Sequence, residues 1–167
     1  SIASEEQDQV VKIYADGAYK EQMIEAARNP LIKAFTTNTS LMKKPGVKNY
    51  TAFAERVLNT FPDYPISLEV FSDDITEMES QARQIASWGD NVFVKIPITN
   101  THGVSCCPLI SRLVADGVRV NATAILCYAQ IDEVFEALGT QPAIISIFAG
   151  RIADTGRNPE PFISHAL

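Results

Sequence analysis

A lysine interrupts an otherwise apolar run, Val92–Pro97, near the middle of the chain. The run is short, rich in β-branched residues and closed by a proline, which is typical of a buried strand. An ammonium group in such a strand must either reach water or lose its proton. Because burial disfavours the charged form, an amine held there can act as a nucleophile near neutral pH. We therefore expect Lys95 to form a Schiff base with a carbonyl substrate. The alternative is a lysine at a strand end with a solvated head.

Schiff-base chemistry also needs a carboxylate that moves protons, a positioned water and groups that orient substrate hydroxyls. Asp16 and Glu69 stand near the ends of two other predicted strands and supply carboxylates. Arg151 follows a glycine after the last predicted strand and could bind an anionic group such as a phosphate. Neutral orienting groups occur near further strand ends, namely Asn38, Asn121, Thr123 and Ser146.

Segments with strand character alternate with segments of helical period along the chain. We expect strands over residues 10–16, 34–38, 66–71, 92–97, 118–125 and 143–149. We expect helices over residues 18–28, 50–61, 75–88, 104–115 and 130–138, and another beginning near Pro159. This alternation predicts a single α/β domain over residues 1–167, with a parallel sheet and covering helices. Two architectures compete: a (β/α)8 barrel and an open doubly wound sheet.

The polarity of the strands favours the barrel. Every second residue of each predicted strand is polar toward its carboxyl end, as in Ser67 and Glu69 or Asn121 and Thr123. In an open sheet such a face would lie under helices and its polar groups would lack partners. In a barrel the same face lines the interior, and its upper layer forms the active site. Because a closed barrel has eight strands, we expect six strand–helix units of a TIM-type barrel truncated at its C-terminus.

Composition limits the partners. The chain has 167 residues and a formal net charge of −6, which argues against nucleic acid or an anionic membrane as the main partner. No apolar run is long enough to predict a transmembrane helix. The three cysteines, Cys106, Cys107 and Cys127, indicate neither a disulfide framework nor a zinc site and fit a reducing cytoplasm.

Six stretches, taken together and in order, give the chain a resemblance to the transaldolase family. They cover the chain from about Val11 to Asp154 and are Tyr14–Asp16, Thr36–Ser40, Ser67–Val70, Val94–Pro97, Asn121–Thr123 and Ser146–Ile152. The resemblance implies a class I aldolase mechanism on an α/β barrel, with no metal and no cofactor. It implies transfer of a dihydroxyacetone unit from a ketose phosphate to an aldose phosphate in the pentose phosphate pathway.

The resemblance also assigns roles to individual residues. Lys95 would form the Schiff base, Asp16 would be the acid and base at the hydroxyl whose carbon bond breaks, and Glu69 with Thr123 would hold the catalytic water. Asn38 and Asn121 would orient the transferred fragment. The sugar-phosphate side would be lined by Ser146, Phe148 and Arg151. We further expect sugar-phosphate substrates, a homo-oligomer and a cytoplasmic location.

Two alternatives remain open at this point. A sister branch of the family cleaves fructose 6-phosphate as a lyase and tends to carry Gln and Tyr at the positions of Glu69 and Phe148. Because this chain has Glu and Phe there, it is more similar to the transferase branch. The second alternative is an inactive barrel fragment. Thr39 also departs from the proline that the family carries after the Thr-Thr-Asn sequence.

Overall fold

A parallel sheet forms the centre of the molecule. The computed structural model describes residues 13–16, 20–30, 32–37 and 50–166. Within them the sheet has six strands, paired in the order in which they occur in the chain. The strands are β1 (Ile13–Asp16), β2 (Ile32–Thr36), β3 (Ile66–Glu69), β4 (Val92–Pro97), β5 (Val120–Ile125) and β6 (Ile144–Ile147).

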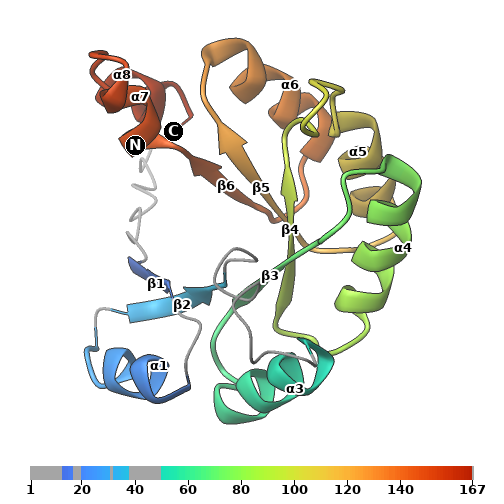
Figure 1. Cartoon of the computed structure of the whole chain (residues 1–167), viewed down its shortest axis with the longest axis vertical. Helices are drawn as coiled ribbons and strands as arrows, with labels where there is room; N and C mark the ends of the chain where they lie inside the picture. Colours follow the sequence, from blue (N-terminus) through green and yellow to red (C-terminus); the bar gives the residue numbers. More distant parts are fainter. Residues whose placement is uncertain (1–12, 17–19, 31, 38–49, 167) are drawn as a thin grey trace, which may run out of the picture.

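Helices connect the strands and stand outside the sheet. Figure 1 shows the strands curling around a common centre, with the helices on the outer side. The helices of the described residues are α1 (Lys20–Ala27), α3 (Tyr50–Thr60), α4 (Ile75–Ala86), α5 (Cys107–Ala115), α6 (Tyr128–Leu138), α7 (Ala149–Asp154) and α8 (Glu160–His165). Across these same residues, every helix is too short or too polar to cross a bilayer.

The strand order decides between the two predicted architectures. A doubly wound sheet reverses its strand order at a switch point, which places helices on both faces. Here each strand pairs with the next one in the chain, so successive right-handed crossovers place their helices on one face. The prediction of a partial (β/α) barrel is confirmed, and the doubly wound alternative is excluded.

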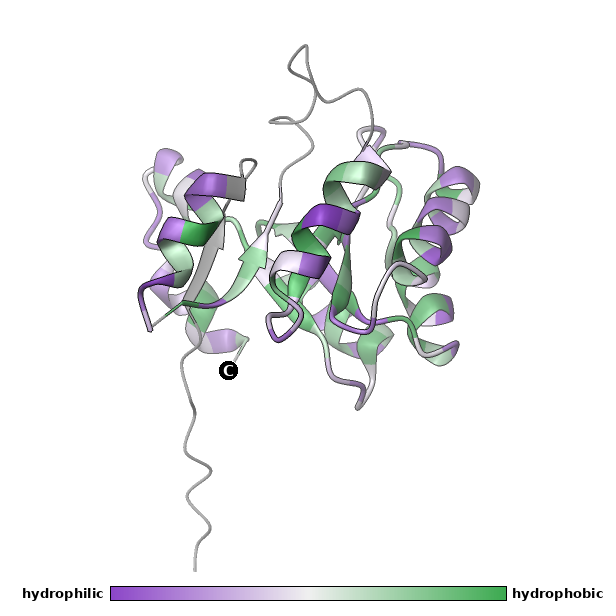
Figure 2. Ribbon diagram, turned by 90° about the horizontal axis from the view of Figure 1, so that it is seen from below, coloured by the Kyte–Doolittle hydropathy of each residue, from purple (hydrophilic) through white to green (hydrophobic). Residues whose placement is uncertain are grey.

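The core lies between the outer face of the sheet and the helices. The outward residues Leu68, Val94 and Ile96 are fully buried, and the helix residues Leu109 and Leu113 pack over this face. Burying each such side chain contributes about 1.5–3 kcal/mol. Figure 2 shows the corresponding division of the helices, with apolar residues toward the sheet and polar residues outside. This apolar face leaves the polar parity of the strands for the inner face.

Local signals explain most element boundaries. Asp74 caps α4, because its Oδ1 accepts a hydrogen bond from the Glu77 N–H at 2.9 Å. The predicted strand over residues 143–149 is too long. Strand β6 ends at Ile147, and Phe148 is already the N-cap residue of helix α7. Nothing in the sequence signals this early end, because Phe148 and Ala149 continue the apolar run of residues 143–147.

An irregularity interrupts β5 directly after Thr123. The pairing of β5 with β6 shifts register between Ala122 and Ile125, and Ala124 adopts a φ of 64°. A residue with a Cβ atom disfavours this left-handed conformation by about 1–2 kcal/mol. Strain of this kind often accompanies functional positions, and here it adjoins a predicted site residue.

Candidate active site

The predicted nucleophile lies at the middle of a row across three strands. Lys95 of β4 is paired with Glu69 of β3 on one side and with Asn121 of β5 on the other. Paired residues of parallel strands point to the same face, and neighbouring strands lie about 4.8 Å apart. The sheet therefore brings Glu69, Lys95 and Asn121 together on its inner face, as the sequence predicted.

The head of Lys95 faces the end of β2. The side chain is half-buried, and its Nζ lies 3.5 Å from the carbonyl oxygen of Thr37. Thr37 is itself buried. Its N–H and its Oγ1 both donate to the carbonyl oxygen of Ser67 at 3.0 Å, which fixes the position of this residue. The ammonium group is thus partly removed from water and sits among protein dipoles, which differs from a lysine with a solvated head.

A chain of hydrogen bonds joins β3, β5 and β6 on the inner face. Asn121 is fully buried, and its Nδ2 donates to Ser67 Oγ at 2.9 Å. On the other side, Ser146 Oγ donates to Asn121 Oδ1 at 2.8 Å. The structure therefore brings the predicted residues Asn121 and Ser146 into direct contact. It adds Ser67, which the sequence marked only as an inward polar residue.

Thr123 carries a buried hydroxyl group that has no hydrogen-bond partner in the part of the chain that the structure describes. The residue is 2% exposed, and within the described residues its Oγ1 makes no hydrogen bond. Leaving a buried hydroxyl unsatisfied costs about 1–3 kcal/mol. Such a group in a native fold marks a place where a water or ligand atom completes the bonding. Thr123 pairs with Pro97, two residues beyond Lys95, at the carboxyl ends of the strands.

The two predicted carboxylates are described to different extents. Glu69 is half-buried at the last residue of β3. Asp16 is the last residue of β1 and pairs with Thr36, which places its backbone at the carboxyl edge of the sheet. Its side chain, and all of Asn38, lie outside the described part of the structure. Their roles therefore stay predictions.

Tyr50, at the start of α3, adds a phenol that sequence reasoning missed. Its hydroxyl donates to the Glu69 carbonyl oxygen at 3.4 Å, and its ring packs edge-on against Phe71 with centroids 4.5 Å apart. Burial, the largest effect, raises the pKa of the Tyr50 phenol to about 12. In the sequence Tyr50 is one aromatic residue at the start of an amphipathic helix, so no local signal pointed to the site.

Phe148 and Arg151 lie beyond the end of β6. The Phe148 N–H donates to the Ile125 carbonyl oxygen at 2.9 Å, which anchors this turn beside β5. Both side chains are exposed and line a hollow of about 620 Å³ that also includes Asp154. Among the described residues, neither side chain hydrogen-bonds to the row of Lys95. The structure thus places them at the carboxyl end of the sheet but in a separate hollow.

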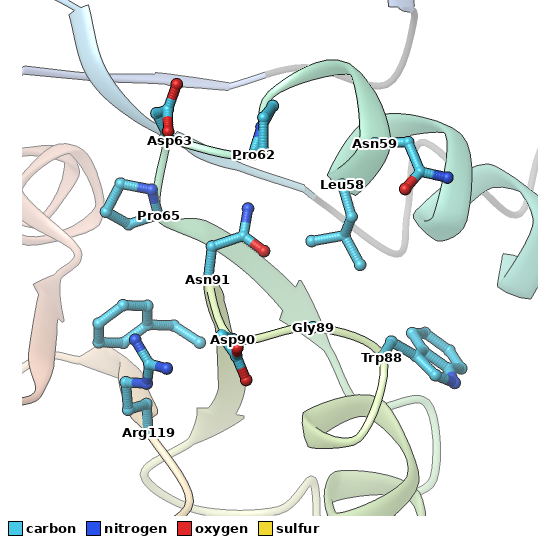
Figure 3. A pocket seen from close by; sticks show the side chains of 11 residues that line it. Leu58, Asn59, Pro62, Asp63, Pro65, Trp88, Gly89, Asp90, Asn91 and Arg119 are labelled. Carbon is cyan, nitrogen blue, oxygen red and sulfur yellow. The ribbon is translucent and has the colours of Figure 1, made fainter.

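A second hollow opens at the amino ends of the strands. It measures about 510 Å³, and Figure 3 shows Asp63, Asn91 and Arg119 around it. The Arg119 guanidinium carbon lies 5.7 Å from the ring centroid of Phe93, which precedes Lys95 by two residues on the same face. In α/β barrels the amino end of the strands serves stability and the carboxyl end serves catalysis. We therefore assign the chemistry to the Lys95 end.

The three cysteines differ in how deeply they are buried. Cys106 and Cys107 are buried and unpaired, and burial raises the pKa of each thiol to about 11. Cys127 is half-exposed at the start of α6. Within the described residues, no group of three or more His, Cys, Asp or Glu side chains is arranged to hold a metal ion.

Comparison with known proteins places this arrangement in a family. Residues 13–165 match the family model described as transaldolase/fructose-6-phosphate aldolase. A probable transaldolase of Dehalococcoides mccartyi is 34% identical over 148 residues, covering 89% of this chain and 65% of the relative. One of Roseiflexus castenholzii is 36% identical over 146 residues, covering 87% and 64%.

The matches cover most of this chain but only part of each relative. A probable transaldolase of Streptococcus equi subsp. zooepidemicus is 34% identical over 154 residues, covering 92% of this chain and 68% of the relative. The chain thus spans about two thirds of the length of these relatives. The family match runs from β1 to the last residue of α8 and includes every strand of the sheet. The chain belongs to the transaldolase/fructose-6-phosphate aldolase family.

Proposed function

We propose that this chain carries the catalytic residues of a transaldolase-type transferase, which moves a dihydroxyacetone unit between a ketose phosphate and an aldose phosphate. The observation that carries the proposal is the row of Glu69, Lys95 and Asn121, with the lysine head half-buried against the Thr37 carbonyl group. Because the chain covers only about two thirds of its relatives, the activity of the whole enzyme is part of the proposal.

Lys95 is the proposed nucleophile. Its neutral amine attacks the ketone carbon, water leaves, and an imine forms. Asp16 accepts the proton of the substrate hydroxyl as the adjacent carbon–carbon bond breaks, and the aldose phosphate leaves. The electron pair of that bond moves toward the imine nitrogen and leaves an enamine on Lys95. The enamine carbon then attacks an acceptor aldehyde, whose oxygen takes a proton from Asp16. Water finally hydrolyses the new imine and frees the lysine.

Thr123 and Glu69 are the proposed holders of that water. The Thr123 hydroxyl, which has no partner among the described residues, supports this role, because a water molecule would satisfy it. Glu69 lies in the same row as Lys95, so a water bound between the two strands would stand beside the imine carbon. The geometry supports a general-base role for the carboxylate in hydrolysis.

The remaining predicted residues are proposed to bind the sugar phosphate. Asn38 and Asn121 would orient hydroxyl groups of the transferred fragment, and Ser146 would line the sugar-phosphate side. Phe148 and Arg151 would line the side that takes the phosphate, and the guanidinium group of Arg151 is suited to it. We also propose that the enzyme acts in the pentose phosphate pathway, in the cytoplasm and as a homo-oligomer.

Transfer and lyase activity separate in one assay. The protein is incubated with fructose 6-phosphate, with and without erythrose 4-phosphate, and the sugar products are analysed by mass spectrometry. The proposal predicts a new ketose phosphate, longer than the donor by one carbon, only when the acceptor is present. Release of glyceraldehyde 3-phosphate and dihydroxyacetone at the same rate without the acceptor would favour the lyase instead.

Two lysine variants show whether the product depends on Lys95. Lys95→Met removes the proposed nucleophile at nearly constant volume. Lys33→Met removes an exposed lysine of strand β2 and serves as the matched control. We expect product from the wild type and from Lys33→Met, and none from Lys95→Met. Equal product from both variants would contradict the proposal.

A further inference from the structure

Ser67 forms hydrogen bonds with residues on both sides of strand β3, Asn121 and Thr37. It lies on β3, two residues before Glu69 and on the same face, and it is 1% exposed. Its Oγ accepts a hydrogen bond from Asn121 Nδ2 at 2.9 Å. Its carbonyl oxygen accepts two hydrogen bonds from Thr37, both at 3.0 Å. One small residue thus contacts both the amide of Asn121 and the strand end that faces the lysine.

The hydrogen bond from Asn121 to Ser67 crosses the strand that carries Lys95. Strand β4 lies between β3 and β5 in the sheet. Ser67 pairs with Phe93, whereas Asn121 pairs with Lys95. The bond therefore passes over the inner face of β4 between these two side chains. It forms a polar layer directly on the amino-end side of the lysine, between Lys95 and the hollow around Arg119.

The two serines determine which groups of Asn121 remain for a substrate. A side-chain amide has two N–H donors and two acceptor lone pairs. Ser67 occupies one donor, and Ser146 occupies one acceptor site. With respect to the described residues, one N–H and one lone pair remain, and their directions are fixed as long as both serine contacts persist. Rotation of the amide by half a turn would exchange the donor and the acceptor that the substrate meets.

We propose that Ser67 is a positioning residue for the transferred fragment: its hydroxyl group fixes the amide of Asn121. The inference rests on the proposed function, since it takes Asn121 and Lys95 as the groups that meet the substrate. A merely structural Ser67 would satisfy a buried amide and affect stability alone. A positioning Ser67 also determines how the substrate is oriented.

The first test follows the Asn121 amide itself and needs no activity. Solvent exchange of the Asn121 Nδ2 protons is measured by NMR in the wild type, in Ser67→Ala and in Ser87→Ala. Ser87 is the control, because its Oγ donates to the Gln84 carbonyl oxygen at the exposed end of α4, away from the row of Lys95. We expect exchange about 5- to 30-fold faster in Ser67→Ala and unchanged in Ser87→Ala. Unchanged exchange in Ser67→Ala would overturn the inference.

The second test measures whether the orientation of the Asn121 amide affects how the substrate binds. Borohydride trapping is measured with fructose 6-phosphate and with acetone, which offers a carbonyl group without hydroxyl groups. Ser67→Ala should lower the trapping rate with the sugar phosphate about 5- to 30-fold and leave the rate with acetone unchanged. Equal losses with both ketones would show a general structural effect and would contradict a positioning role.

Further variants keep the inference testable if Ser67→Ala folds poorly. Ser67→Cys retains the volume and a weak acceptor, so it should show a smaller loss in the same direction. Ser146→Ala acts on the same amide, and its effect on trapping should be less than additive with that of Ser67→Ala. Additive effects would oppose the inference. If the wild type forms no adduct with either ketone, the proposed function fails while the amide exchange still decides the positioning of Asn121.

Discussion

Replacing Thr123 with valine should leave the stability of the fold nearly unchanged while it impairs turnover. The change exchanges a buried hydroxyl for a methyl group of the same shape. In the structure that hydroxyl is 2% exposed and, within the described residues, makes no hydrogen bond. Because the substitution removes no hydrogen bond to a described residue, and the proposed water is displaced together with the hydroxyl group, the free energy of unfolding should change by less than about 0.5 kcal/mol. For a chain of this size, 1 kcal/mol corresponds to about 2–4 °C in the melting temperature.

Thr37→Val is the matched control for this prediction. Thr37 is equally buried, but its hydroxyl donates to the Ser67 carbonyl oxygen at 3.0 Å. The same substitution there should lower the free energy of unfolding by about 1 kcal/mol, because a satisfied hydrogen bond is lost. Urea unfolding of the three proteins, followed by circular dichroism, measures both changes. If Thr123→Val is destabilised as much as Thr37→Val, the reasoning from the unpartnered hydroxyl is refuted.

The kinetic part of the same prediction concerns release of the imine. Without the Thr123 hydroxyl the catalytic water loses one of its proposed partners, so hydrolysis should slow more than formation of the imine. In a single-turnover experiment, the adduct trapped by borohydride should therefore persist longer in Thr123→Val than in the wild type. Adduct that decays at the wild-type rate would contradict the role of Thr123 in holding the water.

Three further predictions concern stability and reactivity. Burial raises the pKa of the Tyr50 phenol in the folded protein to about 12. Below pH 10 the phenol is neutral in both the folded and the unfolded protein. Between pH 10 and 12 it ionises in the unfolded protein but not in the folded one. Stability should therefore fall by about 1.4 kcal/mol per pH unit over that interval, and Tyr50→Phe should lack this part of the decline in urea unfolding. Ala124→Gly should raise the free energy of unfolding by about 0.5–1 kcal/mol, since glycine accepts the φ of 64° without strain; a loss of stability would contradict that estimate. At pH 8, iodoacetamide should modify half-exposed Cys127 well before buried Cys106 and Cys107, whose thiols have pKa values of about 11; peptide mass spectrometry checks the order.

The sheet could be predicted from the sequence because two regularities agree along the chain. Alternation of strand and helix patterns gives a parallel sheet, and a polar parity in each strand requires an inner face that helices do not cover. The structure confirms this in the row of Glu69, Lys95 and Asn121. Boundaries were less predictable: β6 ends at Ile147 although the apolar run continues through Phe148. The turn into α7 depends on backbone geometry that an apolar pattern does not encode.

The contacts of the site could be predicted only in part. Sequence parity placed Asn121 and Ser146 on one face, but it could not show that Ser67 bonds Asn121 across an intervening strand, 54 residues away in the chain. The phenol of Tyr50 reaches Glu69 from a helix, and nothing in the helical pattern of α3 distinguishes it from a core aromatic residue. That Thr123 has no hydrogen-bond partner among the described residues is likewise visible only once the neighbouring strands are in place.

Peptide mapping tests most directly whether Lys95 forms the covalent bond with the substrate. The protein is incubated with fructose 6-phosphate, reduced with borohydride, digested with trypsin and analysed by tandem mass spectrometry. A modified Lys95 resists trypsin, so residues 84–112 should appear as one peptide with a three-carbon adduct on its only lysine. An adduct confined to Lys33 or other lysines, or no adduct on any peptide, would contradict the account.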